Sequence, residues 1–223
     1  MQRFIEIWSQ YHVLYIQGTL MTLKISLFGV IFGTIIGMFL ALGKLSKSTI
    51  LKKLAGFYIE IIRGTPLLVQ IMIVYLGLSY YLPDTVGFFK SRIFLGTLAI
   101  CLNSAAYVAE IIRAGIESID KGQVEAASSL GMNRKLTMRY IIIPQAIKNI
   151  LPVLGNEFIV LIKETAIISM VGIQDLMYSA TKVQGITYQP LIPFFIAALI
   201  YLTITFSLSK VLAIYERRLK TSD

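Results

Sequence analysis

The chain has 223 residues, of which 56% are hydrophobic and 15% charged, so it is far more apolar than a soluble domain and is expected to be an integral membrane protein. Its net charge of +9 does not indicate nucleic-acid binding, because the basic residues are concentrated beside apolar runs, where membrane orientation and anionic lipid explain them. The single cysteine, Cys101, and the single histidine, His12, exclude a disulfide framework and a metal site with several Cys or His ligands within one chain.

Five stretches meet the requirement for a membrane helix, which is roughly 20 mainly apolar residues. They are predicted at residues 19–42, 57–80, 93–112, 150–168 and 191–215. The sequence therefore predicts an all-α, polytopic membrane protein whose single transmembrane domain covers residues 1–223.

The first span carries a strip of small residues at four-residue spacing. Gly29, Gly33, Gly37 and Ala41 lie on one helix face and allow another backbone to approach closely. Such strips serve both packing within a chain and contact between subunits, and we expect the first use here.

The second span combines a charge pair with a helix-weakening sequence. Glu60 and Arg63 are three residues apart, so they share a helix face and can pair within the helix. Pro66 follows directly and has no amide proton for the carbonyl of Ile62. We expect that carbonyl to find another partner, such as the Thr65 hydroxyl, water or a ligand.

Polar side chains also line the third and fourth spans. The third carries Asn103, Tyr107 and Glu110, and the fourth carries the pairs Asn156 with Lys163 and Glu157 with Glu164. Snorkelling or local ion pairs explain single charges near span ends. Together, however, the charges favour a wet interior able to hold a zwitterion, because ionisable groups in hydrocarbon cost several kcal/mol. The predicted solute-binding residues are Glu60, Arg63, Thr65, Asn103, Tyr107, Glu110, Glu157, Lys163 and Glu164.

The distribution of Lys and Arg predicts the orientation, since cytoplasmic loops carry the excess. Eleven such residues lie on one side, namely Lys44, Lys47, Lys52, Lys53, Lys121, Arg134, Lys135, Arg139, Arg217, Arg218 and Lys220. Four lie on the other, namely Arg3, Lys90, Arg92 and Lys182. We therefore expect the N-terminus outside and the C-terminus in the cytosol.

Between the third and fourth spans, residues 118–140 form a polar segment on the predicted cytosolic side. Asp120 and neighbouring polar residues suit a helix N-terminal turn, and Gly131 suits a helix C-terminus. Asn133 is a plausible cap for a second short helix that lasts until Pro144 turns the chain toward the next span. The segment is thus predicted to be two helices joined by a sharp turn.

The spacing within this segment resembles the EAA loop of ATP-binding cassette import permeases. The matching residues are Glu125, Ala126, Ala127, Gly131, Ile141, Ile143 and Pro144, with Ile143 where Leu is usual. Further motifs, EIIRGTPLLVQ at 60–70, AYVAEIIRAGIESIDKGQVEAASSLGM at 106–132 and LIKETAIIS at 161–169, are similar to the polar amino acid permease family.

The resemblance implies a permease of the bacterial cytoplasmic membrane that carries a polar amino acid by alternating access. It implies a cytosolic coupling helix that docks on a separate ATPase, with Glu125, Ala126, Ala127, Gly131 and Arg134 as the coupling residues. It also implies a second permease subunit, giving a homodimer, and an extracytoplasmic solute-binding protein. The chain has no GxxxxGK[ST] phosphate loop, so we expect no catalytic residue, cofactor or metal of its own and ATP hydrolysis by the partner.

The sequence leaves the solute open. The buried carboxylates outnumber the buried cations, which leans toward a basic amino acid such as arginine, lysine or histidine, whereas glutamine or cystine is the neutral alternative. A passive channel would explain the polar stripes but not the docking element. An intramembrane enzyme would need a nucleophile with a base or a metal cluster, and no such constellation stands out.

Overall fold

The computed structural model describes residues 2–220, and this part of the chain is helical throughout, with no strand. The helices from the N-terminus to the third long helix are α1 (Gln2–Lys44), α2 (Thr49–Gly64), α3 (Leu67–Met72), the π-helix η1 (Ile73–Gly77), α4 (Leu78–Tyr81), the 3₁₀ turn η2 (Asp84–Val86) and α5 (Arg92–Glu117). The remainder are α6 (Lys121–Ser129), α7 (Arg134–Thr137), the π-helix η3 (Met138–Ile142), α8 (Ile143–Glu164), the 3₁₀ helix η4 (Thr165–Val171), α9 (Leu176–Thr187) and α10 (Ile192–Lys220).

The packing of α1 against α5 organises the bundle and uses the predicted strip of small residues. A Cβ atom at Gly33 would lie 2.7 Å from the Ser104 hydroxyl, and one at Gly37 would lie 2.8 Å from the carbonyl oxygen of Ala105. Both distances are too short for a side chain, so the two backbones approach as closely as glycine allows. The strip serves packing within the chain, as expected.

A cluster of buried aliphatic side chains joins five elements of the fold. Ile25 of α1, Ile71 of α3, Ile100 of α5 and Leu161 of α8 pack together with Ile168 of η4. Each is at most 2% exposed. Between membrane helices, the close van der Waals packing of such side chains favours association, because lipid tails are as apolar as the side chains themselves.

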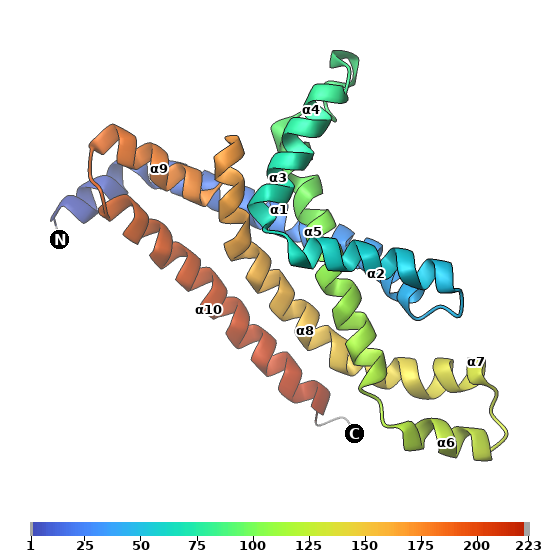
Figure 1. Ribbon diagram of the computed structural model, residues 1–223. Coiled ribbons are helices and arrows are strands. Elements are labelled where there is room, and N and C mark those ends of the chain that lie inside the picture. The colour runs from blue at the N-terminus through green and yellow to red at the C-terminus, as the bar shows by residue number, and fades with distance from the viewer. Residues whose placement is uncertain (1, 221–223) are drawn as a thin grey trace.

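The second predicted span is broken where the sequence predicted weakness. The helix α2 ends at Gly64, Thr65 and Pro66 are extended, and α3 starts at Leu67. The axes on the two sides of this break differ by 108°, and Figure 1 shows α3 and α4 leaving the bundle steeply from the end of α2. The stretch is therefore either a broken span or a re-entrant segment.

The observed helices differ from the predicted spans in extent. α1 begins at Gln2, well before residue 19, because its first turns pack against α9 and α10; the Tyr15 hydroxyl donates to the carbonyl of Pro193 at 3.2 Å. α9 was not predicted, and it packs along this early part of α1 (Figure 1).

Three helices of the described chain, α1, α5 and α10, are long and apolar enough to cross a membrane, and α2 with α3–α4 makes a fourth if the bent pair is one span. α8 falls outside these criteria, and it carries four charged residues, Lys148, Glu157, Lys163 and Glu164. The five-span count thus depends on whether α8 crosses the membrane.

Candidate functional site

Glu110 of α5 is surrounded by basic side chains from three helices. Its Oε1 lies 2.6 Å from Nζ of Lys44, at the end of α1. Its Oε2 lies 2.8 Å from Nη2 of Arg113 and 3.7 Å from Nη1 of Arg63 on α2. Arg113 also pairs with Glu117. Through these three cations, Glu110 joins α1, α2 and α5. Its side chain is only 16% exposed, so solvent screens these ion pairs little.

Arg63 therefore pairs with Glu110, and the predicted pair with Glu60 is wrong. The guanidinium also lies 5.6 Å from the ring centre of Tyr107, within the range of a cation–π contact. Glu60 is exposed and forms no ion pair within residues 2–220. The spacing of Glu60 and Arg63 along α2 allowed a pair within the helix, but Arg63 pairs instead with the carboxylate of Glu110 on α5.

The broken second span is held by a side chain that the sequence reasoning missed. The amide nitrogen of Gln70 lies 2.7 Å from the carbonyl oxygen of Ile62 and 2.9 Å from that of Thr65. Its Oε1 accepts a 2.9 Å hydrogen bond from Nδ2 of Asn103 on α5. The free carbonyl that Pro66 creates is thus bound by Gln70, whereas the Thr65 hydroxyl donates to Ile61 instead.

The polar segment after α5 forms the two predicted helices. Asp120 caps α6, accepting from the amide of Gly122 at 2.6 Å, and Asn133 caps α7, accepting from the amides of Lys135 and Leu136. Gly131 has a φ of 78°, in the left-handed region, where it ends α6.

The turn at Gly131 is a Schellman motif. The amide of Gly131 donates to the carbonyl of Ser128, and the amide of Met132 donates to the carbonyl of Ala127, both at 3.0 Å. Ala127 is 3% exposed and packs inside the segment, while Leu130 at the tip is 82% exposed. The turn therefore presents an apolar side chain to the outside.

Pro144 changes the direction of the chain without ending the helix. α7, η3 and α8 follow one another without a gap, and the π-helical turn lies just before Pro144. Proline removes one hydrogen bond and clashes with the carbonyl four residues earlier, which is relieved by a wider turn. In Figure 1 α7 runs beside α6, and α8 leaves it at an angle toward the rest of the bundle.

Comparison with known proteins identifies this arrangement. Residues 33–221 match the family of binding-protein-dependent transport system inner membrane components. The chain belongs to this family. It is a multi-pass membrane permease.

Three known proteins are similar to this permease over most of its length. The chain is 47% identical over 204 residues to a putative glutamine transport system permease protein of Rickettsia felis, and the match covers 92% of each chain. It is 44% identical to the arginine transport system permease protein of Bacillus subtilis over 208 residues, covering 93% of each. The crystal structure of an amino acid ABC transporter with histidines matches with a TM-score of 0.88 and 50% identity, covering 94% of this chain and 96% of that one.

The remaining predicted residues of the permease lie on α8 and are not joined to the Glu110 cluster. Glu157 and Glu164 are half-buried and form no close ion pair within the described residues, although the exposed Lys163 attracts Glu164 electrostatically. Asn103 is buried and bound to Gln70. The structure thus separates one carboxylate that is neutralised by cations from two that are not.

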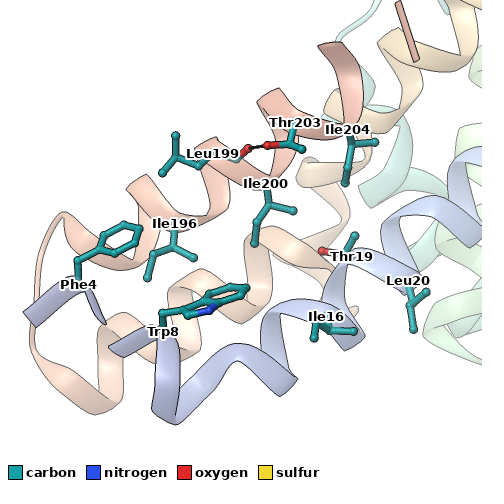
Figure 2. A pocket seen from close by; sticks show the side chains of 10 residues that line it. All are labelled: Phe4, Trp8, Ile16, Thr19, Leu20, Ile196, Leu199, Ile200, Thr203 and Ile204. Carbon is teal, nitrogen blue, oxygen red and sulfur yellow. Dashed lines mark hydrogen bonds between the residues drawn. The ribbon is translucent and has the colours of Figure 1, made fainter. Parts of the chain in front are cut away.

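An apolar pocket of the permease lies apart from all these groups. It has a volume of about 450 Å³ and is lined by residues of α1 and α10, shown in Figure 2. Its two hydroxyls, on Thr19 and Thr203, donate to carbonyls of their own helices at 2.7 Å. Apart from the indole N–H of Trp8, the lining offers no free side-chain donor for a polar solute, and the pocket suits hydrocarbon.

Proposed function

We propose that this permease carries a polar amino acid, with preference for a basic one, across the bacterial cytoplasmic membrane by alternating access. The observation that carries the proposal is the difference between its carboxylates. Glu110 is held by Lys44, Arg63 and Arg113, so it has little capacity left for a cationic solute. Glu157 has no such partner and Glu164 has only the weaker attraction of the exposed Lys163, and half-buried carboxylates without a close ion pair favour a cation.

The names of the relatives support an amino acid as the solute and leave its charge open. Relatives named for glutamine and for arginine are similarly close, at 47% and 44% identity. A neutral polar amino acid such as glutamine is therefore the second candidate. The unpaired carboxylates on α8 favour the basic one.

We infer five spans, with α8 as the fourth to cross the membrane. Its charged residues make it polar for a lipid-facing helix, but this polarity is explained if one face lines an aqueous path. The excess of Lys and Arg places α6 and the C-terminus on the cytosolic side and the N-terminus outside.

A second copy of the permease is proposed to cover the polar groups that one chain leaves open. Glu60, Asn156 and Lys163 are exposed on helices of the transmembrane region. Exposure of such groups to hydrocarbon is costly, so a partner subunit or a water-filled path between two subunits is expected around them. A homodimer would supply both.

Energy is proposed to come from a cytosolic ATPase that docks on α6, so the permease itself needs no cofactor and only the partner binds ATP. The exposed apolar side chains of Val124 on α6 and Leu130 at the turn after it support this role, because a short polar segment has no reason to expose them unless they meet a partner. Glu125 is exposed, and since Asp120 caps the helix, Glu125 is free for an interfacial contact. An extracytoplasmic binding protein would deliver the solute on the other side.

Solute-stimulated ATPase activity of the reconstituted transporter tests the solute class. Glu157→Gln and Glu164→Gln should each lower stimulation by arginine at least tenfold, and Glu117→Gln, which removes a carboxylate from the cytosolic end of α5, should leave it unchanged. Equal stimulation by arginine in all three variants would sink the proposed role of α8. Stimulation of the unaltered protein by glutamine but not by arginine would select the second candidate.

Docking on the ATPase is tested separately by co-purification. Leu130→Ser should reduce the amount of ATPase recovered with the permease, while Leu136→Ser, which replaces an exposed leucine on α7, serves as the matched control. Full recovery of the ATPase with Leu130→Ser would contradict docking at this turn.

A further inference from the structure

A second feature of the cytosolic segment is a basic pocket, in which Arg134 is the one residue that was also expected to take part in coupling. It has a volume of about 610 Å³ and lies between the α1–α2 connection and α7–η3. Its lining comprises Lys47, Arg134, Lys135 and Arg139 with the apolar side chains of Met138 and Ile143. Four cations thus surround one opening.

These cations differ from those around Glu110. Within residues 2–220, none of the four forms an ion pair, and the Arg139 guanidinium lies over the ring of Tyr140 at 5.6 Å. Four unneutralised charges that surround one pocket repel each other, and they attract an anion with several oxygen acceptors. A phosphate group has this chemistry.

The pocket continues into an apolar strip along α8. Ile143 is both in the pocket lining and 42% exposed, and Ile147 and Leu151, one and two turns further, are 46% and 39% exposed. Residues at this spacing lie on one face of a helix. A bound molecule with a phosphate in the pocket would therefore have an apolar path for a hydrocarbon tail, which a free phosphate would not need.

The position of the pocket also argues for the membrane over the ATPase. Figure 1 shows α6 beside α7, and the pocket is lined by residues of α7, η3, α8 and the α1–α2 connection but by none of α6. The pocket includes Lys47 from the short connection between α1 and α2, which the excess of Lys and Arg assigns to the cytosolic side. Basic residues directly next to membrane helices on this side are within reach of anionic lipid headgroups.

We propose that this pocket binds the phosphate of an anionic phospholipid, with one acyl chain along Ile143, Ile147 and Leu151. Basic pockets on the cytoplasmic side of membrane helices have the charge and depth for such headgroups. The bound lipid would neutralise the segment that connects α6 to α8, and so hold α7 against the membrane surface.

The test uses the full-length permease in nanodiscs of phosphatidylcholine with spin-labelled phosphatidylglycerol or spin-labelled phosphatidylcholine as the probe. The immobilised fraction of each probe gives the preference for the anionic lipid. Lys135→Gln with Arg139→Gln should lower this preference by roughly fivefold for each cation removed. Lys52→Gln with Lys53→Gln removes the same charge from exposed positions of α2 outside the pocket and should retain it.

Other outcomes would overturn the proposal. Equal losses in the two double variants would mean that the preference comes from the overall charge and not from the pocket. Displacement of the lipid probe by millimolar inorganic phosphate would indicate a site for soluble anions. Unchanged lipid preference combined with loss of the co-purified ATPase in the pocket variant would assign these cations to the ATPase interface.

Discussion

Gln70 of α3 and Asn103 of α5 are joined by a hydrogen bond of 2.9 Å, which connects the broken second span to the centre of the third. The same Gln70 side chain binds the carbonyl oxygens of Ile62 and Thr65 on the other side of the break. One amide group thus holds the 108° change of direction and fixes it against α5.

Removal of this amide should destabilise the permease more than removal of its partner. Gln70→Ala removes the partner of the Ile62 and Thr65 carbonyls and of the buried Asn103 amide, at a cost of about 2 kcal/mol, whereas Asn103→Ala loses one neutral hydrogen bond, worth about 1 kcal/mol. Thermal unfolding of the purified protein in detergent measures both. The double variant should lose less than the sum of the two single losses, because the residues share an interaction. Strict additivity would contradict the contact.

Glu110→Gln should be among the most destabilising single changes in the polar part of the chain. It leaves Lys44, Arg63 and Arg113 close together without their shared carboxylate, and removal of one partner from a mostly buried ion pair costs about 3 kcal/mol. Glu117→Gln removes an exposed partner of Arg113 and should cost less than about 1 kcal/mol.

The melting temperatures of the two variants, compared at low and high salt, give the measurement. The Glu110 variant should regain stability as salt rises, since added ions screen the repulsion among the three cations. Similar melting temperatures for the two variants would mean that the Glu110 cluster does not join the helices.

Helix caps, turns and helix breaks depend on a few consecutive residues, so they could be predicted from the sequence. The two helices of the cytosolic segment and the turn between them are of this kind. The cap at Asn133 and the left-handed Gly131 follow from local backbone chemistry. The break at Pro66 follows from the missing amide proton. Each of these needs only a few consecutive residues.

Features that depend on how distant helices meet could not be predicted in the same way. Spacing placed Glu60 beside Arg63, but the carboxylate that binds Arg63 comes from α5, 47 residues further along the chain. Gln70 ends the motif at residues 60–70, but its role could not be predicted, because its partners come together only when the chain bends at Pro66. The length of α1 was underestimated because its first turns owe their stability to α9 and α10.

The backbone conformation of Gly131 predicts a specific pattern of substitutions. Its φ of 78° costs roughly 1–2 kcal/mol for an ordinary L-residue and more for a β-branched one, whereas a Cβ atom there would meet nothing within 4 Å. Gly131→Val should therefore disrupt the turn and abolish solute-stimulated ATPase activity while membrane insertion is kept. Gly131→Asn should retain most activity, because Asn tolerates the left-handed region. Normal transport by the Val variant would refute the coupling role of this turn.

Two glycines provide a matched test of the close packing between α1 and α5. A Cβ atom at Gly37 would lie 2.8 Å from the carbonyl oxygen of Ala105 and 2.9 Å from Cβ of Val108, so Gly37→Ala forces the two helices apart, at a cost of about 1–3 kcal/mol. Gly56, inside α2, has nothing within 4 Å of the same position, so Gly56→Ala should be neutral or stabilise its helix by roughly 0.5–1 kcal/mol. The melting temperature should fall for the first variant and stay or rise for the second. If Gly37→Ala is as stable as the unaltered protein, the strip of small residues does not pack against α5 and must be assigned to a contact between subunits.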